Sequence, residues 1–232
     1  MILKGVGIIL LDNNRGKAYI QNLVKNNLYP AFAIVLAQKN SAKKVSSSKY
    51  SKDFFDASEP VVHTLNKSGI KYKKIDSEDC NDKAVISELK SRAEKYFIYT
   101  GGGILSEKIL GVGKKFIHIH PGIVPDYRGS TCFYYSIINE GKVGATAFFM
   151  EKSIDTGNVI AQKRYKKPDI ADIDNIYDPY IRSDLLVDVM KDYIKKGKLK
   201  SKKQDNKPGE TYYIIHPVLK HLAILMCRQK KS

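Results

Sequence analysis

Continuous apolar runs alternate with amphipathic stretches in the N-terminal part of the chain. The runs at residues 6–11 and 31–37 are apolar throughout and flanked by polar or turn-forming residues, which is typical of strands covered on both faces. The same reasoning predicts strands at 70–75 and 96–100, helices at 16–26, 60–67 and 82–94, and a serine- and lysine-rich loop at 41–52. Strands that alternate with helices in this way favour parallel pairing, with helices on both faces of the sheet.

The pattern changes in the second half of the chain. Strands are predicted at 115–119, 144–150 and 159–166, helices at 131–140 and 180–195, a tight loop at 153–157, and a short β-like run followed by a helix within 211–227. The predicted fold is therefore α/β, with a Rossmann-like, mostly parallel sheet. We expect residues 1–168 to form the main domain and residues 169–232 a C-terminal helical and β extension that packs on it.

The composition is that of a globular protein. Hydrophobic residues make up 43% of the chain and charged residues 28%. No window approaches the roughly 20 apolar residues that a membrane span requires, and the apolar start runs directly into a polar turn, which fits a buried strand better than a signal peptide. Cys80, Cys132 and Cys227 are widely spaced and form no CxxC pair, so neither a disulfide framework nor a zinc site is indicated. We expect a cytoplasmic protein with free thiols.

The formal net charge of +16 raises the question of a polyanionic partner. Lysines are densest at residues 39–52 and 191–203 but are otherwise scattered, which favours a solvated basic surface over a binding face. A nucleic-acid-binding module would need basic residues gathered on one face with aromatic residues between them. Its signature would be an affinity that falls steeply with salt, without turnover. We therefore expect a small-molecule substrate, and nucleic acid is the alternative.

Two histidines follow one another at a strand end. His118 and His120 are two positions apart on the predicted strand, so their side chains point to the same face. Pro121, Gly122 and Pro125 then direct the chain out of the sheet at its carboxyl edge, where open α/β sheets place their ligands. Taken alone, the pair could be half of a metal site, a structural pair or part of a catalytic site, although no third metal ligand follows at a telling spacing.

A carboxylate in a second loop favours the catalytic interpretation. Asp155 lies in the predicted loop at 153–157, beside Gly157. A carboxylate held near a histidine orients the ring and raises its basicity.

In the order and spacing of the histidine motif and the Asp155 loop, residues 101–165 resemble the folate-dependent formyltransferases. This family includes glycinamide ribonucleotide transformylase, methionyl-tRNA formyltransferase and the sugar N-formyltransferases. That family shares an Asn-x-His-Pro-Ser-Leu-Leu-Pro segment, often followed by Arg-Gly, and then an Asp-x-Gly loop. Here residues 118–125 read His-Ile-His-Pro-Gly-Ile-Val-Pro, followed by Arg128-Gly129 and then by Asp155-Thr156-Gly157. Residues 103–106 are similar to the family's loop that lines the folate pocket.

The resemblance implies a formyltransferase fold and the transfer of a formyl group from 10-formyltetrahydrofolate to an amine. It implies catalytic roles for His118, His120 and Asp155, cofactor binding by Gly103, Ile104, Leu105, Ser106, Thr156 and Gly157, acceptor binding by Tyr127 and Arg128, and no metal. His118 stands where the family has asparagine, which donates a hydrogen bond to the formyl oxygen. A histidine ring nitrogen can also donate, with an altered pH dependence, and a drifted activity is the alternative.

The resemblance leaves several acceptors open. The methionyl-tRNA enzyme normally carries an additional C-terminal barrel domain, for which the residues after Tyr165 are too few. Glycinamide ribonucleotide transformylase is close in length, but its motif usually lacks the Arg-Gly pair. The sugar enzymes keep that pair and act on nucleotide-linked amino sugars, whose diphosphate suits a basic surface. We therefore favour a nucleotide-linked amino sugar and no membrane partner, and a homodimer stays open.

Overall fold

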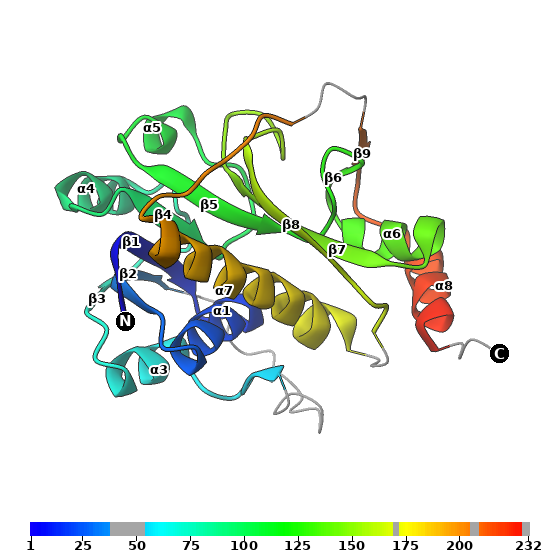
Figure 1. Ribbon diagram of the computed structural model, residues 1–232, viewed down its shortest axis with the longest axis horizontal. Coiled ribbons are helices and arrows are strands. Elements are labelled where there is room, and N and C mark those ends of the chain that lie inside the picture. The colour runs from blue at the N-terminus through cyan, green and yellow to red at the C-terminus, as the bar shows by residue number, and fades with distance from the viewer. Residues whose placement is uncertain (38–53, 169–171, 205–208, 229–232) are drawn as a thin grey trace.

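The fold is built on one large sheet, as a computed structural model of residues 1–37, 54–168, 172–204 and 209–228 shows (Figure 1). The loop predicted at 41–52 lies outside these residues. The sheet contains β1 (Ile2–Leu11), β2 (Tyr29–Leu36), β3 (Tyr72–Ile75), β4 (Tyr96–Tyr99), β5 (Lys115–His120), β7 (Val143–Phe149) and β8 (Val159–Tyr165), in the order β3-β2-β1-β4-β5-β7-β8. The first five strands in this order pair in parallel, whereas β7 pairs antiparallel with both of its neighbours, β5 and β8. The prediction of a mostly parallel α/β sheet is confirmed.

Helices cover both faces of the sheet. One face packs against α1 (Asn14–Lys25), α3 (Val61–Lys67) and α7 (Asp178–Lys196), and the other against α4 (Lys83–Ser91) and α5 (Glu107–Leu110). Alternate strand residues therefore enter different apolar clusters: Ile117 and Ile119 face α7, whereas Phe116 faces the α4 side. This alternation places the side chains of His118 and His120 on the α4 side of the sheet.

The connection from β1 to α1 is tight. Asn13 caps the helix by accepting a hydrogen bond from the Gly16 amide at 2.9 Å. A Cβ atom at Gly16 would lie 2.0 Å from the Leu11 carbonyl oxygen, so only glycine allows this close approach. The turn sets the start of α1 directly beside the carboxyl end of β1.

The remaining elements form a smaller unit at one end of the sheet. It contains β6 (Tyr127–Gly129), α6 (Cys132–Glu140), the π-helix η1 (Ile173–Tyr177), β9 (Glu210–Tyr212) and α8 (Pro217–Arg228), and β6 pairs in parallel with β9. Apolar residues of α6, α7 and α8, among them Phe133, Ile181 and Ala223, pack together there. The helix predicted after Pro217 is confirmed. None of the helices within the described ranges is long and apolar enough to cross a membrane.

The largest differences from the predicted bounds are at the ends of two elements. The helix predicted at 82–94 stops at Ser91, because Arg92 has an extended backbone (φ −85°, ψ 146°). The β-like run after residue 211 is also shorter. Pairing with β6 stops at Tyr212, and Tyr213 and Ile214 are each 81% exposed.

Candidate active site

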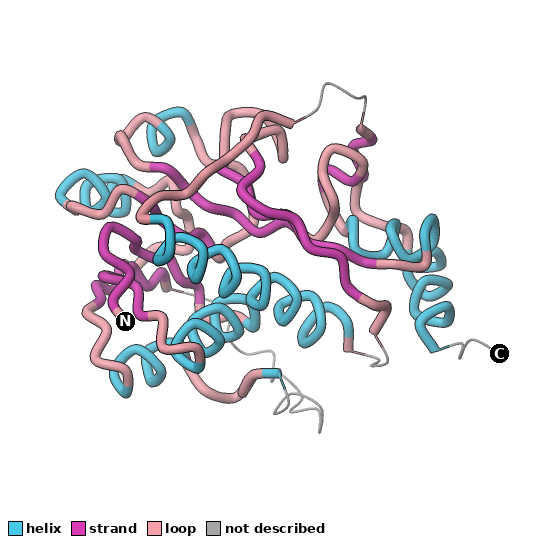
Figure 2. Tube along the Cα trace, viewed as in Figure 1, coloured by secondary structure: helices cyan, strands magenta, loops and turns pink. Residues whose placement is uncertain are grey.

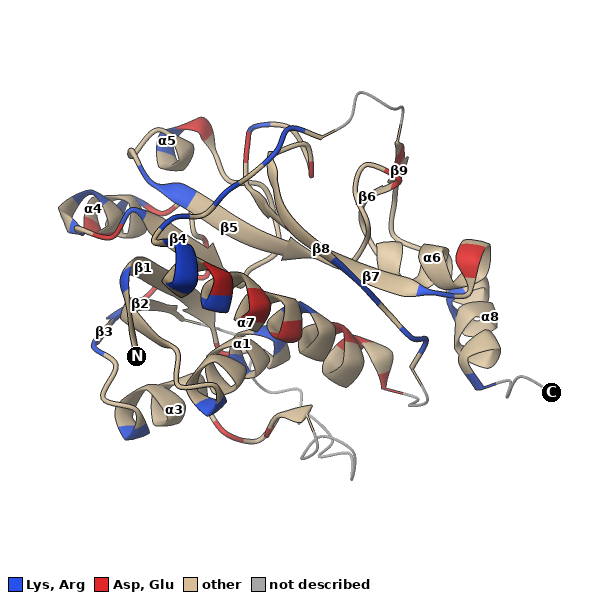
Figure 3. Cartoon of the chain, in the orientation of Figure 1, with Lys and Arg blue, Asp and Glu red and all other residues tan. Residues whose placement is uncertain are grey.

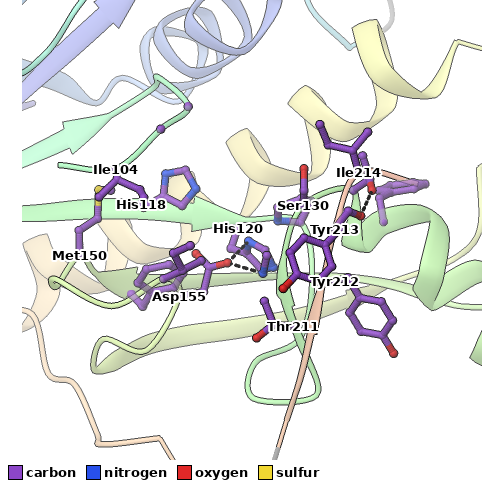
Figure 4. Close-up of a pocket in the computed structure, with 18 of the residues that line it drawn as sticks. Ile104, His118, His120, Ser130, Met150, Asp155, Thr211, Tyr212, Tyr213 and Ile214 are labelled. Atoms are coloured by element: carbon purple, nitrogen blue, oxygen red, sulfur yellow. Dashed lines mark hydrogen bonds and ion pairs between the residues drawn. The ribbon is translucent and has the colours of Figure 1, made fainter. Parts of the chain in front are cut away.

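A cavity of about 680 Å³ opens at the carboxyl end of β5 (Figure 4). Its volume lies in the range of small-molecule sites, which is about 300–1,000 Å³. The wall is formed by His118 and His120 of β5, by residues 102–105 and 150–155, by residues 129–131, 133 and 134, by residues 211–214, and by Arg15, Asp174, Asp178 and Arg182 from the helical side. Segments remote along the chain therefore meet at one place.

His120 is held between two oxygen atoms. His120 is 2% exposed, with Nε2 2.9 Å from the Tyr127 carbonyl oxygen. Its Nδ1 lies 3.3 Å from Asp155 Oδ2 (Figure 4). A neutral imidazole carries one proton, so it cannot donate to both oxygens at once. Burial lowers the pKa of His120, and the Asp155 carboxylate opposes that shift. A buried neutral ring that faces two acceptors is placed to take up a proton.

The Asp155 carboxylate is fixed by the segment that follows β5. Its Oδ2 accepts a hydrogen bond from the Gly129 amide at 2.7 Å. The Asp155 backbone adopts a left-handed conformation (φ 53°), which is uncommon for a residue other than glycine. Two residues on, a Cβ atom at Gly157 would lie 1.7 Å from the Phe149 carbonyl oxygen. The loop is therefore folded tightly against the end of β7.

His118 lies on the same cavity wall as His120 (Figure 4). Its Nδ1 is buried and has no hydrogen-bond partner within the described part of the chain. Burial, together with the positive charges of Arg182 and Arg15, holds the pKa of His118 well below its ordinary value. The ring is thus neutral near pH 7 with a single N–H, and the tautomer that carries it on the unpartnered Nδ1 can donate a further hydrogen bond.

Acid is expected to destabilise the folded protein through His118. A histidine whose pKa is lower in the folded than in the unfolded chain contributes stability that is fully present above the unfolded value of about 6.5 and is lost as the pH falls below it. We therefore expect the free energy of unfolding, measured by urea denaturation, to fall from about pH 7 to about pH 5. In His118→Asn this fall should be smaller. Identical pH slopes for the two proteins would contradict this explanation.

Two arginines line the inner wall of the cavity. Arg182 is buried, donates to the Ile119 carbonyl oxygen at 2.9 Å and pairs with Asp178 Oδ1 at 2.8 Å. Burial alone would lower the pKa of Arg182, but the charges around it, that of Asp178 above all, raise it above its ordinary value. Arg15, at the start of α1, donates to the Gly101 carbonyl oxygen at 3.0 Å. Sequence reasoning named none of these three charged residues, although a charged residue on the apolar stripe of the predicted helix at 180–195 was a visible signal.

The predicted cofactor residues divide into two groups. Gly103, Ile104 and Leu105 line the cavity. The structure places the others outside the lining: the Ser106 amide donates to Asn81 Oδ1 at 2.7 Å, the Thr156 hydroxyl donates to the Ser153 carbonyl oxygen at 3.1 Å, and Gly157 lies against Phe149. These three residues shape the two loops, and their side chains do not line the wall.

The predicted acceptor residues, Tyr127 and Arg128, are also absent from the lining. Tyr127 is 4% exposed and its ring stacks on Tyr212, while Arg128 donates to Gln204. Tyr134 contributes to the aromatic and apolar wall of the cavity instead. Tyr213 and Ile214 also belong to this wall (Figure 4).

The structure also bears on two possibilities raised by the sequence, a nucleophilic cysteine and a metal site. Cys132 is fully buried, and burial raises the pKa of its thiol to about 12, so it packs and is not poised as a nucleophile. Within the four described ranges, no three side chains of the histidine, cysteine, aspartate or glutamate type come together as a metal site would require.

Comparison with known proteins decides the family. Residues 6–178 match the family model described as formyl transferase. The chain belongs to the formyl transferase family. The match includes His118, His120 and Asp155, and it confirms the resemblance drawn from the sequence motif.

Sequence relatives carry formyltransferase names, and solved structures share the fold. The chain is 30% identical over 138 residues to methionyl-tRNA formyltransferase of Fusobacterium nucleatum, covering 56% of this chain and 43% of that protein. It therefore spans less than half of that relative. Its fold is similar to those of a sugar N-formyltransferase from a Shewanella species (20% identity, 96% and 87% of the two chains, TM-score 0.59) and of phosphoribosylglycinamide formyltransferase from Bacillus halodurans (17% identity, 83% and 96%, TM-score 0.57).

Proposed function

We propose that the protein transfers a formyl group from 10-formyltetrahydrofolate to the amine of a small acceptor. The observation that carries this proposal is the 3.3 Å approach of His120 Nδ1 to Asp155 Oδ2 in a cavity that His118 also lines. The loop at 103–105 forms part of the same wall, where the family resemblance locates the folate. Catalytic groups and a folate slot would then share one cavity.

The proposed chemistry needs one hydrogen-bond donor and one proton acceptor. The acceptor nitrogen attacks the formyl carbon, and negative charge develops on the formyl oxygen in a tetrahedral intermediate. The bond from that carbon to the folate nitrogen then breaks, while a proton leaves the acceptor nitrogen and a proton reaches the folate nitrogen. We assign His118 as donor to the oxygen, and the His120–Asp155 pair as the relay that takes up the proton and returns it.

The role assigned to His118 predicts a partial loss of turnover. Removing one oxyanion donor typically lowers kcat by about 10²–10³-fold, and we expect this loss in His118→Ala, measured by tetrahydrofolate release. His118→Asn restores a donor of the type found in the family, so it should retain more activity than His118→Ala. Equal loss in the two variants would indicate that the donor function does not reside at this position.

A nucleotide-linked amino sugar is the acceptor that we favour. The N-formyltransferase of Helicobacter canadensis, which has a similar fold (18% identity, TM-score 0.59), was solved with folinic acid and dTDP-3-aminofucose. In the present chain, Arg15 lines the cavity and forms no ion pair with another described residue, so its charge is available to an anionic group of an acceptor. Glycinamide ribonucleotide and methionyl-tRNA are the alternatives, since relatives with those names share the fold or the sequence.

A turnover assay with one panel of acceptors tests the proposal. Purified protein and 10-formyltetrahydrofolate are incubated with nucleotide-linked amino sugars, glycinamide ribonucleotide or methionyl-tRNA. Tetrahydrofolate release is followed by absorbance and the formylated product by mass spectrometry. Turnover with an amino sugar supports the favoured acceptor, and turnover with another amine supports formyl transfer but replaces the sugar. Salt-sensitive RNA binding with no turnover on any acceptor would favour the nucleic-acid alternative. That alternative would need basic residues gathered on one face. Figure 3 instead shows basic residues on elements at both ends of the molecule, with acidic residues along α7.

A further inference from the structure

Gln204 joins two segments that meet beside the cavity. Its side-chain amide nitrogen donates to the carbonyl oxygens of Asp155, at 2.7 Å, and Gly157, at 2.9 Å. Its side-chain oxygen accepts from Arg128, at 2.7 Å from Nη2 and 3.3 Å from Nε. Two donors and two acceptor positions are all that a glutamine side chain offers, so its hydrogen-bonding capacity is fully used.

The backbone presents Gln204 from a fixed place. After α7, the chain runs beside the start of β8, where Val159 and Lys202 exchange two backbone hydrogen bonds of 2.8 and 2.9 Å. In Figure 2 this segment and the connection between β7 and β8 are both drawn as loops, and the Gln204 bonds hold them side by side. The side chain of Gln204 therefore reaches the Asp155 loop from an anchored strand-like segment.

The Asp155 loop and the segment that contains Arg128 are also connected directly, beside the catalytic pair. Gly129, the residue after Arg128, donates its amide to Asp155 Oδ2. The Asp155 backbone is left-handed, a conformation that is unfavourable for a residue with a side chain and persists where its surroundings enforce it. Gln204 helps to enforce this conformation, because its side chain donates a hydrogen bond to the carbonyl oxygen of Asp155 itself.

We propose that Gln204, together with Arg128, is a positioning residue that holds the Asp155 carboxylate against His120. Neither side chain lines the cavity, so both act through Asp155 and touch no substrate. This inference rests on the proposed function for its kinetic consequences, but its geometric content does not depend on catalysis. It also gives Arg128 a role other than the acceptor binding suggested by the sequence.

The first test follows the Gly129 amide, which reports on the Asp155 carboxylate without any reaction. In Gln204→Met, which keeps the chain length but loses the amide, we expect Gly129 to exchange its amide hydrogen about tenfold faster in NMR, because its acceptor is displaced. Gln204→Glu should behave alike, since a carboxylate can accept from Arg128 but cannot donate to the two carbonyls. Lys203→Met, an exposed neighbour, is the control and should match the wild type. Wild-type exchange at Gly129 in both folded variants would overturn the proposal.

The second test is a double-mutant cycle on turnover. Misplacing a catalytic group by about 1 Å can cost 10²-fold, so we expect Gln204→Met to lower kcat by about 10- to 100-fold with a smaller change in KM. In an Asp155→Asn background the same substitution should cost almost nothing, because its target is already removed. Full additivity would overturn the proposal and indicate a general structural role. If the wild type shows no formyl transfer, the proposed function fails while the exchange experiment still decides the positioning role.

Discussion

Replacing His120 with alanine is expected to lower kcat by about 10²–10⁴-fold, which is the usual contribution of a positioned acid–base group. The ring contacts Asp155 and is buried between two oxygen acceptors, so it is placed to pass on the proton that leaves the acceptor nitrogen. His63→Ala is the control, because His63 is exposed on α3, away from the cavity lining. Wild-type turnover in His120→Ala would remove the acid–base assignment, whereas an equal loss in His63→Ala would indicate a nonspecific effect.

Asp155→Asn separates the two members of the pair. Asparagine can still accept the Gly129 amide, but it lacks the charge that raises the pKa of His120. Residues that act as one unit lose activity non-additively, so a double variant should be little worse than His120→Ala alone. We expect this pattern because the two residues act together as one proton relay, which fails when either of them is removed.

The sheet could be predicted from the sequence because its strands are covered on both faces. Parallel strands buried in this way appear as unbroken apolar runs, such as 6–11 and 31–37. Short elements left weaker signals. The three-residue strand β9 depends on pairing with β6, a partner remote along the chain, and no local pattern marks where that pairing stops.

The candidate site could be predicted only in part, for a similar reason. His118, His120 and Asp155 belong to motifs with recognisable spacing, and the structure brings them to one cavity. Gln204 has no motif, since its importance arises from carbonyl groups that approach it only in the folded chain. Arg128 could be recognised as part of a motif, but the direction in which its side chain points could not be predicted. A sequence motif identifies residues that matter, whereas tertiary packing decides whether each faces a ligand or another residue.

The ion pair between Asp178 and Arg182 carries the second large prediction, which concerns stability. The two residues lie one turn apart at the start of α7, with side chains 14% and 7% exposed and 2.8 Å between Oδ1 and Nε. Removing one partner of a buried pair leaves the other charge without compensation, which costs about 3–5 kcal/mol. We therefore expect Asp178→Ala to lower the free energy of unfolding by about that amount in urea denaturation.

The same helix offers a matched control for this prediction. Asp192 and Lys196 are also one turn apart on α7, with side chains 45% and 42% exposed, and such a surface pair contributes about 0.3–0.5 kcal/mol. Asp192→Ala should therefore change stability little. If Asp178→Ala and Asp192→Ala cost the same stability, burial would not be the cause.

A double variant tests the cause of the loss in a second way. Asp178→Leu combined with Arg182→Met removes both charges, so no buried charge is left without compensation, and the variant should recover much of the lost stability. Both residues also line the cavity, so the double variant should regain stability while the cavity wall stays without their two charges. Recovery of stability without recovery of turnover would separate the structural role of the pair from a role of its charges in the cavity.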